Sequence, residues 1–316
     1  MALPIGFRLR PPAPGDLEAV AEVLVAGQLA TSEPVTLDKE FLRGEWGRPG
    51  FDVATDAWVV TGPAGTVVAY GQAVREEPDV AESWGIVHPR HRGLGIGAAL
   101  LGAVEQRAAE MLAGSAAGRF RHTVHAGDDA AAALLRARGL RPVRHFWHMQ
   151  IDLTGLPEPA LSLEGISVTV IAPPGDLPAV HAVLEEAFAD DWGHHPRPFD
   201  AWAEEETGHS GHDPGLWLLA REQGRPVAAL TASTLGEDGW VDYLRVLPSH
   251  RGRGVGAALL QHSFTLFAAR GVPRVILNVD ARNPTGATAL YERAGMRAVK
   301  QWDLRERPPG ESRPRP

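Results

Sequence analysis

The feature that most constrains the fold is an internal repeat, because one motif occurs twice at a nearly fixed distance along the chain. Arg92-Gly93-Leu94-Gly95-Ile96-Gly97 corresponds to Arg251-Gly252-Arg253-Gly254-Val255-Gly256, 159 residues further on. Other landmarks keep the same offset, namely Pro89 and Pro248, His91 and His250, and Trp58 and Trp217. Several landmarks in register indicate a duplicated folding unit. The sequence therefore predicts two similar domains.

Each copy of the motif stands between a strand and a helix. In the second copy, alternating residues from Val241 to Val246 predict a strand, and Pro248 ends it because proline has no N–H for a sheet ladder. An apolar run from Val255 to Leu266 has helical spacing. The glycines between them permit positive φ and let a bound anion approach the free N–H groups at the helix start. The motif is thus a predicted phosphate-binding turn.

The spacing of the motif decides which phosphate ligand fits. A dinucleotide-binding turn begins directly after its strand and has an acidic residue about 20 residues later. Here Leu247 to Arg251 intervene, and the next acidic residue is Asp280. The lysine of a nucleoside-triphosphate loop is also missing. The remaining pattern, Arg-x-x-Gly-x-Gly after a strand that ends in Val-x-Pro, resembles the acyl-CoA pyrophosphate turn of the GNAT N-acetyltransferases.

The composition agrees with two globular domains of ordinary size. The chain has 316 residues, 44% hydrophobic and 22% charged, and its net charge is −8. Such a charge argues against a nucleic-acid-binding protein, which would carry a basic face. We find no apolar run long enough for a bilayer and no signal peptide, so we expect a cytoplasmic protein without membrane partners. Without cysteine, disulfides and thiolate metal sites are excluded.

The order of predicted elements is the same in both halves and is mixed α/β. A strand and a helix are followed by two or three strands, the strand, turn and long helix of the motif, a fifth strand, a short helix and a last strand that closes the same half. This order resembles the GNAT fold, a mixed, splayed sheet flanked by helices. We expect an N-terminal domain (1–154), a linker (155–164), a C-terminal domain (165–306) and a disordered tail (307–316). Among tandem GNAT proteins the chain resembles the mycothiol synthase group.

The resemblance implies acetyl-CoA as the cofactor. In the family the pantetheine arm lies along the fourth strand, here Leu244, Arg245 and Val246, and a backbone N–H near Val246 polarises the thioester carbonyl. The resemblance assigns the pyrophosphate to Arg251, Gly252, Arg253, Gly254, Val255, Gly256 and Ala257. The corresponding residues of the N-terminal half, which would hold a second CoA if that half binds one, are Ile86, Val87, Arg92, Gly93, Leu94, Gly95, Ile96 and Gly97.

A second motif runs from Asn283 to Gly295 and matches the family pattern Asn-x-x-Ala-x-x-Leu-Tyr-x-x-x-Gly, with one extra residue after Asn283. The resemblance assigns Asn283 to capping the short helix and contacting CoA. It assigns Tyr291 to protonating the departing thiolate, which a phenol with a pKa of about 10 can do at neutral pH. The alternative is that Tyr291 only packs between helix and sheet.

The general base is a separate question. Asp242 lies four residues before Val246, so a period of two places both residues on one face of the strand. We take Asp242 as the candidate base; the alternative is a carboxylate that pairs with a nearby arginine. In mycothiol synthases we expect the acid two residues earlier, where this chain has Trp240.

The acceptor pocket is expected in the segment after the first helix of the C-terminal half. Its candidate residues are Asp191, Trp192, His194 and His195, and the segment continues to Glu206. A histidine titrates at about pH 6.5, so His194 or His195 is an alternative base. A solvated polar loop is the competing interpretation. His209, His212 and Asp213 are spaced too loosely for a metal site, and we expect no metal.

The N-terminal half keeps the turn but not the second motif. Aligning Gly139 with Gly295 places Leu135 at the position of Tyr291, and Ser83 corresponds to Asp242. Leucine cannot donate a proton, so we expect this half to bind CoA or to support the fold without catalysis.

The leading interpretation is an acetyl-CoA-dependent N-acetyltransferase that acts on the primary amine of a small molecule, with the C-terminal half catalytic. One alternative is a mycothiol-synthase-like acceptor, an aminosugar-linked cysteine. The other is a non-catalytic acyl-CoA-binding or scaffold protein. The acyl chain and the choice between monomer and homodimer stay open at this point.

Overall fold

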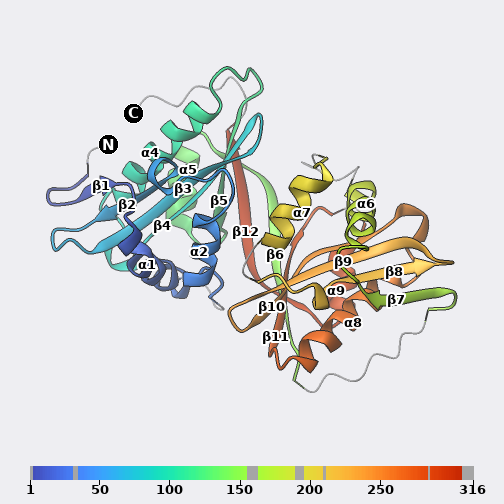
Figure 1. Ribbon diagram of the computed structural model, residues 1–316. Helices are drawn as coiled ribbons and strands as arrows, with labels where there is room; N and C mark the ends of the chain where they lie inside the picture. The colour runs from blue at the N-terminus through green and yellow to red at the C-terminus, as the bar shows by residue number, and fades with distance from the viewer. Residues whose placement is uncertain are drawn as a thin grey trace. The chain divides into compact units, whose positions relative to one another are not determined.

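The computed structural model describes residues 3–30, 35–154, 163–188, 196–208, 211–283 and 285–307. The chain forms two compact units, each a mixed sheet with helices on its faces (Figure 1). Unit 1 consists of Met1–Trp147, Asp280–Arg282 and Val299–Pro316, and unit 2 consists of His148–Val279 and Asn283–Ala298. The mixed α/β class and the tandem arrangement predicted from the sequence are confirmed.

The sheet of unit 1 has the strand order β1-β2-β3-β4-β5-β12. Its neighbours are antiparallel except β4 and β5, which are parallel. The strands are β1 (Arg8–Arg10), β2 (Ala57–Thr61), β3 (Val67–Glu77), β4 (Val80–Val87), β5 (Arg119–His125) and β12 (Arg297–Arg307). The helices are α1 (Leu17–Leu29), α2 (Lys39–Trp46), α3 (Val53–Asp56), α4 (Ile96–Met111) and α5 (Asp129–Ala137).

Strand alternation in unit 1 builds a core on each face of the sheet. Val59 of β2 belongs to the apolar cluster that includes Leu24 of α1, whereas the next residue, Val60, belongs to the cluster that includes Leu100 of α4. Successive side chains of a strand point to opposite faces, so α1 and α4 cover opposite faces.

The sheet of unit 2 has the strand order β6-β11-β10-β9-β8-β7. Strands β10 and β11 are parallel, as β4 and β5 are in unit 1. The strands are β6 (Arg141–Asp152), β7 (Ile166–Val170), β8 (Leu218–Glu222), β9 (Arg225–Leu235), β10 (Asp238–Val246) and β11 (Arg274–Asp280). The helices are α6 (Leu177–Phe188), α7 (Phe199–Gly208), α8 (Val255–Ala269) and α9 (Ala287–Arg293).

The two halves of the chain exchange their last strands. Strand β12 comes from the C-terminal half but pairs with β5 of unit 1, from Trp302 opposite His125 to Arg307 opposite Phe120. Strand β6 comes from the N-terminal half, and from His148 onward it belongs to unit 2, where β11 is its neighbour. The expectation that each half is closed by its own last strand is wrong, because residue alternation identifies a strand but not the edge that it joins.

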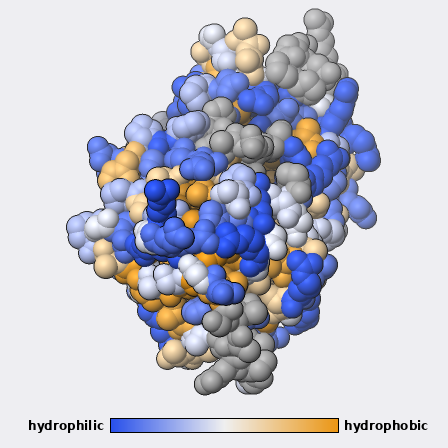
Figure 2. All heavy atoms as spheres, turned by 90° about the vertical axis from the view of Figure 1, so that its right-hand side faces the viewer, coloured by the Kyte–Doolittle hydropathy of each residue, from blue (hydrophilic) through white to orange (hydrophobic). Residues whose placement is uncertain are grey.

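The expected limits 1–154 and 165–306 therefore describe the repeats along the chain, while the compact units differ from them at these two strands. Most of the expected linker 155–164 and of the expected tail 307–316 lies outside the described residues. In the described part of the chain, no helix combines the length and apolarity that crossing a membrane requires. On the face shown in Figure 2, hydrophobic residues lie in patches between hydrophilic ones.

Candidate active site

Strands β10 and β11 of unit 2 stop pairing well before β10 ends. Their ladder joins Gly239 to Val275 and Trp240 to Ile276, and β10 then runs on to Val246. This last part of β10 lines a cavity of about 420 Å³, together with the turn after β10, the first turn of α8 and most of α9. This part of β10 still pairs with β9, so the backbone groups on its other side, toward β11, are available to a ligand.

The cavity gathers most of the cofactor residues that the sequence predicts. They are Leu244, Arg245, Val246, Arg251, Gly252, Gly254, Val255, Gly256, Ala257 and Asn283, with Tyr291 beside them. These residues come from two motifs about 40 residues apart in the sequence. The fold thus brings the residues of both sequence motifs into the lining of one cavity.

The glycine turn has the backbone geometry of an anion seat. Gly254 is the residue before α8 and has φ of +82°, which a side chain would strain. A Cβ on Gly256 would lie 3.2 Å from the side chain of Leu290, so the first turn of α8 packs tightly against α9. Arg251 donates from Nε to the carbonyl of Val246 at 3.1 Å and fixes the turn to the end of β10. The N–H groups at the start of α8 have no partner within the helix, and they favour an anion.

Arg253 lies outside this lining. Its guanidinium donates to Glu222 at 2.6 Å, and the other oxygen of Glu222 lies 3.0 Å from Nε2 of His250. These two hydrogen bonds lower the pKa of Glu222 to about 2. The sequence does not reveal this pairing, because Glu222 belongs to β8, about 30 residues before the turn.

Asn283 lines the cavity but does not cap α9, so this prediction is wrong. The residue before α9 is Gly286, with φ of +73°. The side-chain oxygen of Asn283 instead accepts two hydrogen bonds from Thr285, one from its backbone N–H at 2.8 Å and one from its hydroxyl. The extra residue in this loop accounts for the difference, because Asp128 of unit 1, in the shorter loop, does cap α5 through the N–H of Ala131 at 2.9 Å.

Tyr291 is 5% exposed and lines the cavity from α9. Burial raises the pKa of its phenol above the ordinary value, and the positive charge of Arg245 lowers it in part. The phenol therefore stays protonated at neutral pH. Tyr291 thus places a buried, protonated phenol in the wall of the cavity.

Asp242 lies at a β-bulge. The pairing of β10 with β9 shifts between Val241 and Tyr243, so Asp242 is the extra residue of β10. A bulge interrupts strand alternation, so the period-two argument that placed Asp242 on the face of Val246 does not hold. The carboxylate accepts a hydrogen bond from Ser233 Oγ at 3.1 Å. Burial and then the charge of Glu206 raise the pKa of Asp242 to about 7, although the Ser233 bond lowers it.

Sequence reasoning missed several residues near the site. Gln261 of α8 lines the cavity, and its buried Oε1 has no hydrogen-bond partner among the described residues. Its polar side chain interrupts the apolar run of α8, which is the one signal that could have found it. Tyr243 and Arg197 lie close to Glu206. Asp191, Trp192, His194 and His195 fall outside the described residues.

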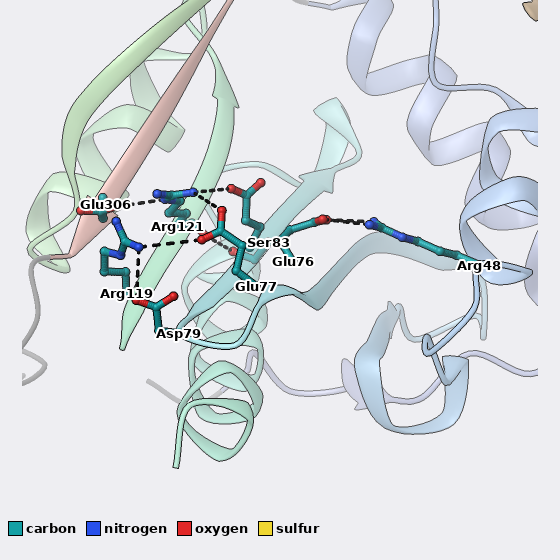
Figure 3. Close-up of polar contacts among 9 residues, drawn as sticks. Arg48, Glu76, Glu77, Asp79, Ser83, Arg119, Arg121 and Glu306 are labelled. Carbon is teal, nitrogen blue, oxygen red and sulfur yellow. Dashed lines mark hydrogen bonds and ion pairs between the residues drawn. The ribbon is translucent and has the colours of Figure 1, made fainter. Parts of the chain in front are cut away.

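Unit 1 repeats the turn, but less of β4 than of β10 lacks a parallel neighbour, because the β4–β5 ladder ends at Ser83 and β4 at Val87. Gly95, before α4, has φ of +81°, almost the value of Gly254. The β4–β5 ladder, however, continues through Glu82 and Ser83, two pairs beyond the residue that corresponds to Trp240. Figure 3 shows Arg121 of β5 between Glu306 and Glu77, at 2.9 and 3.9 Å, which ties β12 and β3 to this region.

The position of Tyr291 is filled in unit 1 by an apolar residue. Leu135 is 2% exposed and belongs to a cluster with Leu101 and Phe120. At the turn, Arg92 forms an ion pair with Asp128 at 3.4 Å. Among the described residues, the position of the phenol therefore holds no proton donor in this unit.

Comparison with known sequences gives a consistent result. Residues 29–140 and 177–296 match the description "Acetyltransferase (GNAT) family". A mycothiol acetyltransferase of Streptomyces coelicolor is 34% identical over 75% of this chain and 75% of its own length. A mycothiol acetyltransferase of Streptomyces avermitilis is 32% identical over 92% of this chain and 91% of its own length.

Solved structures give the same picture. A GCN5-related N-acetyltransferase from Sphaerobacter thermophilus has a TM-score of 0.85 and 33% identity, and the match covers 99% of this chain and 98% of that one. A tandem GNAT protein from the clavulanic acid biosynthesis pathway has a TM-score of 0.73 at 19% identity, over 97% of this chain and 99% of that one. The second likeness concerns the fold alone.

Proposed function

The chain belongs to the acetyltransferase (GNAT) family, and we propose that unit 2 transfers an acetyl group from acetyl-CoA to the primary amine of a small molecule. The chain is an acetyl-CoA-dependent N-acetyltransferase by family; the catalytic unit, the residue roles and the amine are our proposal. The observation that carries it is the cavity in which the glycine turn, the end of β10 that no longer pairs with β11, and Tyr291 meet.

The residues of this cavity fit acetyl-CoA, which supplies the activated acetyl thioester. The start of α8 offers backbone N–H groups for the diphosphate, and its glycines leave room for close approach. The end of β10, from Leu244 to Val246, offers strand hydrogen bonds to the pantetheine arm and an N–H for the thioester carbonyl. Gln261 offers a buried acceptor that the described residues do not satisfy, which suits an N–H donor of the ligand.

Two residues divide the proton transfers of the reaction. Asp242, on β10 two residues before Leu244, takes a proton from the ammonium of the acceptor, so that a neutral amine attacks the acetyl carbon. As the N–C bond forms and the C–S bond breaks, Tyr291 donates its proton to the departing sulfur. The proton that the nitrogen still has to lose then restores the phenol. Asp242 then releases to solvent the proton that it took up, so that both groups end the cycle as they began.

Unit 1 is proposed to support the fold or to bind CoA without catalysis. Leu135 in place of the phenol and the longer β4–β5 ladder favour this assignment. The limits 1–154 and 165–306 are proposed for the two repeats.

The acceptor we favour first is an aminosugar-linked cysteine. The two relatives with the identities given above both bear the name mycothiol acetyltransferase, and one matches over 92% of this chain. Other small amines are the alternative, because Trp240 stands where we expect an acid in that group.

The test is a screen of an amine library that includes this acceptor, with thiol release as the signal and mass spectrometry of the product. Acetylation of one amine well above the background release of thiol is the expected result. No amine-dependent thiol release across a broad panel, with CoA still bound, would favour the second candidate, an acyl-CoA-binding protein without turnover.

A further inference from the structure

A second carboxylate reaches the bulge of β10 from α7. Glu206 is 8% exposed. Its Oε1 accepts a hydrogen bond from Arg197 at 3.2 Å, and its carboxylate is also hydrogen-bonded to the hydroxyl of Tyr243. Tyr243 is the residue after Asp242, and the negative charge of Glu206 acts on the Asp242 carboxylate.

Helix α7 is held firmly where it presents this glutamate. Trp202, one turn before Glu206, is fully buried. Its ring centroid lies 5.1 Å from that of His181 on α6 and 6.0 Å from that of Trp217. Residues four apart lie on the same face of a helix, so the anchoring of Trp202 also directs Glu206 toward β10.

The charge that acts on the Asp242 carboxylate is negative. Glu206 acts on it from α7, Ser233 donates to it from β9, and Tyr243 lies next to it on β10. Arg197 is bonded to Glu206 and is shared with Glu205. Burial raises the pKa of Glu206 as well, and Arg197 lowers it in part. Arg197 therefore serves two carboxylates, that of the buried Glu206 and that of the exposed Glu205.

The repeat supplies an internal comparison. In unit 1, Glu45 of α2 is hydrogen-bonded to Trp84, which corresponds to Tyr243, and accepts from Gln72 at 2.6 Å. In both units, therefore, a glutamate on a helix is hydrogen-bonded to an aromatic side chain on a strand. At the preceding strand position, unit 2 has the carboxylate of Asp242, whereas unit 1 has Ser83. The carboxylate pair is present where we propose catalysis.

We infer that Glu206, held by Arg197 and Tyr243, is a positioning residue of unit 2, whose buried negative charge acts through Asp242 and favours the binding of the acceptor's ammonium there. The inference rests on the proposed function, in which Asp242 is the base. The ligand class is a primary ammonium, because a buried carboxylate that feels the negative charge of Glu206 favours an added cation. The step moves one proton from nitrogen to a carboxylate oxygen and needs no further reactant.

The test compares Glu206→Gln with Glu205→Gln in the full-length protein. Glu205 is bonded to the same arginine at 2.8 Å, but its side chain is 46% exposed. Without the charge of Glu206, Asp242 loses its proton more readily, so the acidic limb of kcat/KM should move to lower pH. We also expect KM for the acceptor to rise and KM for acetyl-CoA to stay constant. Glu205→Gln should move the limb much less.

A second variant reverses the sign of the effect. Arg197→Gln leaves the charge of Glu206 uncompensated and should move the acidic limb to higher pH. Opposite shifts are not expected from a residue that only supports the fold. Thermal melting of each variant separates unfolding from these effects, and if Glu206→Gln does not fold, Arg197→Gln decides the question alone.

A direct titration of the Asp242 carboxyl by carbon-13 NMR, with Asp242→Asn to assign its signal, does not depend on turnover. A lower titration midpoint in Glu206→Gln supports the inference, and an unchanged midpoint together with an unchanged acidic limb overturns it. If Asp242→Asn keeps the wild-type pH profile, the proposed base is wrong, while the NMR titration still decides whether Glu206 controls Asp242.

Discussion

Ser83 and His122 form a hydrogen bond of 2.7 Å across the last pair of the β4–β5 ladder in unit 1. Ser83 Oγ also donates to the carbonyl of Arg121 at 2.9 Å. Burial lowers the pKa of His122 to about 4, so the imidazole is neutral at physiological pH and the bond persists there. The ladder is thus closed at the position that corresponds to Asp242, where unit 2 has a bulge and its own ladder has already ended.

Two glycine variants should distinguish the units. Gly254→Val and Gly95→Val place the same side chain at φ of +82° and +81°, so each should cost about 1–2 kcal/mol of stability. We expect Gly254→Val to raise KM for acetyl-CoA by about tenfold or more, since about 1.4 kcal/mol corresponds to tenfold. Gly95→Val should change turnover by less than about twofold.

Steady-state kinetics checks this pair, and calorimetric titration with CoA shows which unit loses a binding site. The similar destabilisation makes each variant the control for the other. If Gly95→Val loses turnover although it melts at the same temperature as Gly254→Val, the proposal that unit 1 is not catalytic is contradicted.

Tyr291→Phe should lower kcat by about tenfold or more, because loss of the proton donor raises the barrier by about 1.4 kcal/mol or more. CoA binding should change little, since the ring remains in the cavity wall. Burial raises the pKa of Tyr291, so we expect no loss of wild-type activity from this group between pH 7 and its ordinary pKa of about 10. Stopped-flow measurement of thiol release checks both expectations.

The control for this variant is Tyr70→Phe in unit 1. Tyr70 is also buried, and its hydroxyl donates to Gln72 at 2.6 Å. Its loss should cost about 1 kcal/mol of stability and leave kcat unchanged. Equal effects of the two variants on kcat would mean that the phenol of Tyr291 has no chemical role.

Asp242→Asn should abolish the acidic limb of the pH profile and also stabilise the protein at pH 8. The pKa of Asp242 is about 7 in the folded chain and about 3.9 in an unfolded one. A raised pKa means that folding favours the protonated form, so stability is highest below about pH 4 and falls as the pH rises to about 7. The neutral amide avoids this loss.

The gain on Asp242→Asn is therefore expected to be larger at pH 8 than at pH 5, by an amount on the order of 1 kcal/mol or more. Urea unfolding at the two pH values measures it. Glu205→Gln, which removes an exposed carboxylate, should show little dependence on pH. A stability loss for Asp242→Asn that is the same at both pH values would show that the carboxylate is needed for structure.

The sequence was sufficient for what local patterns determine. Glycine spacing and the apolar run predicted a helix that starts at Val255, and α8 starts there. The family pattern placed Tyr291 on a short helix, and it lies on α9 in the cavity wall. Both features depend on neighbouring residues, which a sequence displays directly.

The remaining features depend on residues that meet only after folding. The bulge at Asp242 is a pairing shift between β9 and β10, and nothing in the run from Val241 to Val246 marks it. Arg253, in the turn before α8, pairs with Glu222 of β8. The effect of Glu206 on Asp242 needs α7 and β10 to pack together. These long-range contacts decide the environment of the candidate base, so its face and its pKa could not be predicted.

The strand exchange makes a last prediction about folding. Strand β12 pairs with β5 over six residue pairs, and buried Arg121 bonds to Glu306 of β12. Each half of the chain therefore completes the sheet of the other. We expect the halves to stay associated after cleavage at a protease site inserted between residues 154 and 163, because separation would leave β5 and β11 as open edges. Native gel filtration of the cleaved protein measures this, with the uncut protein as control. Halves that separate at micromolar concentration, each keeping its melting transition, would mean that each half can close its sheet alone.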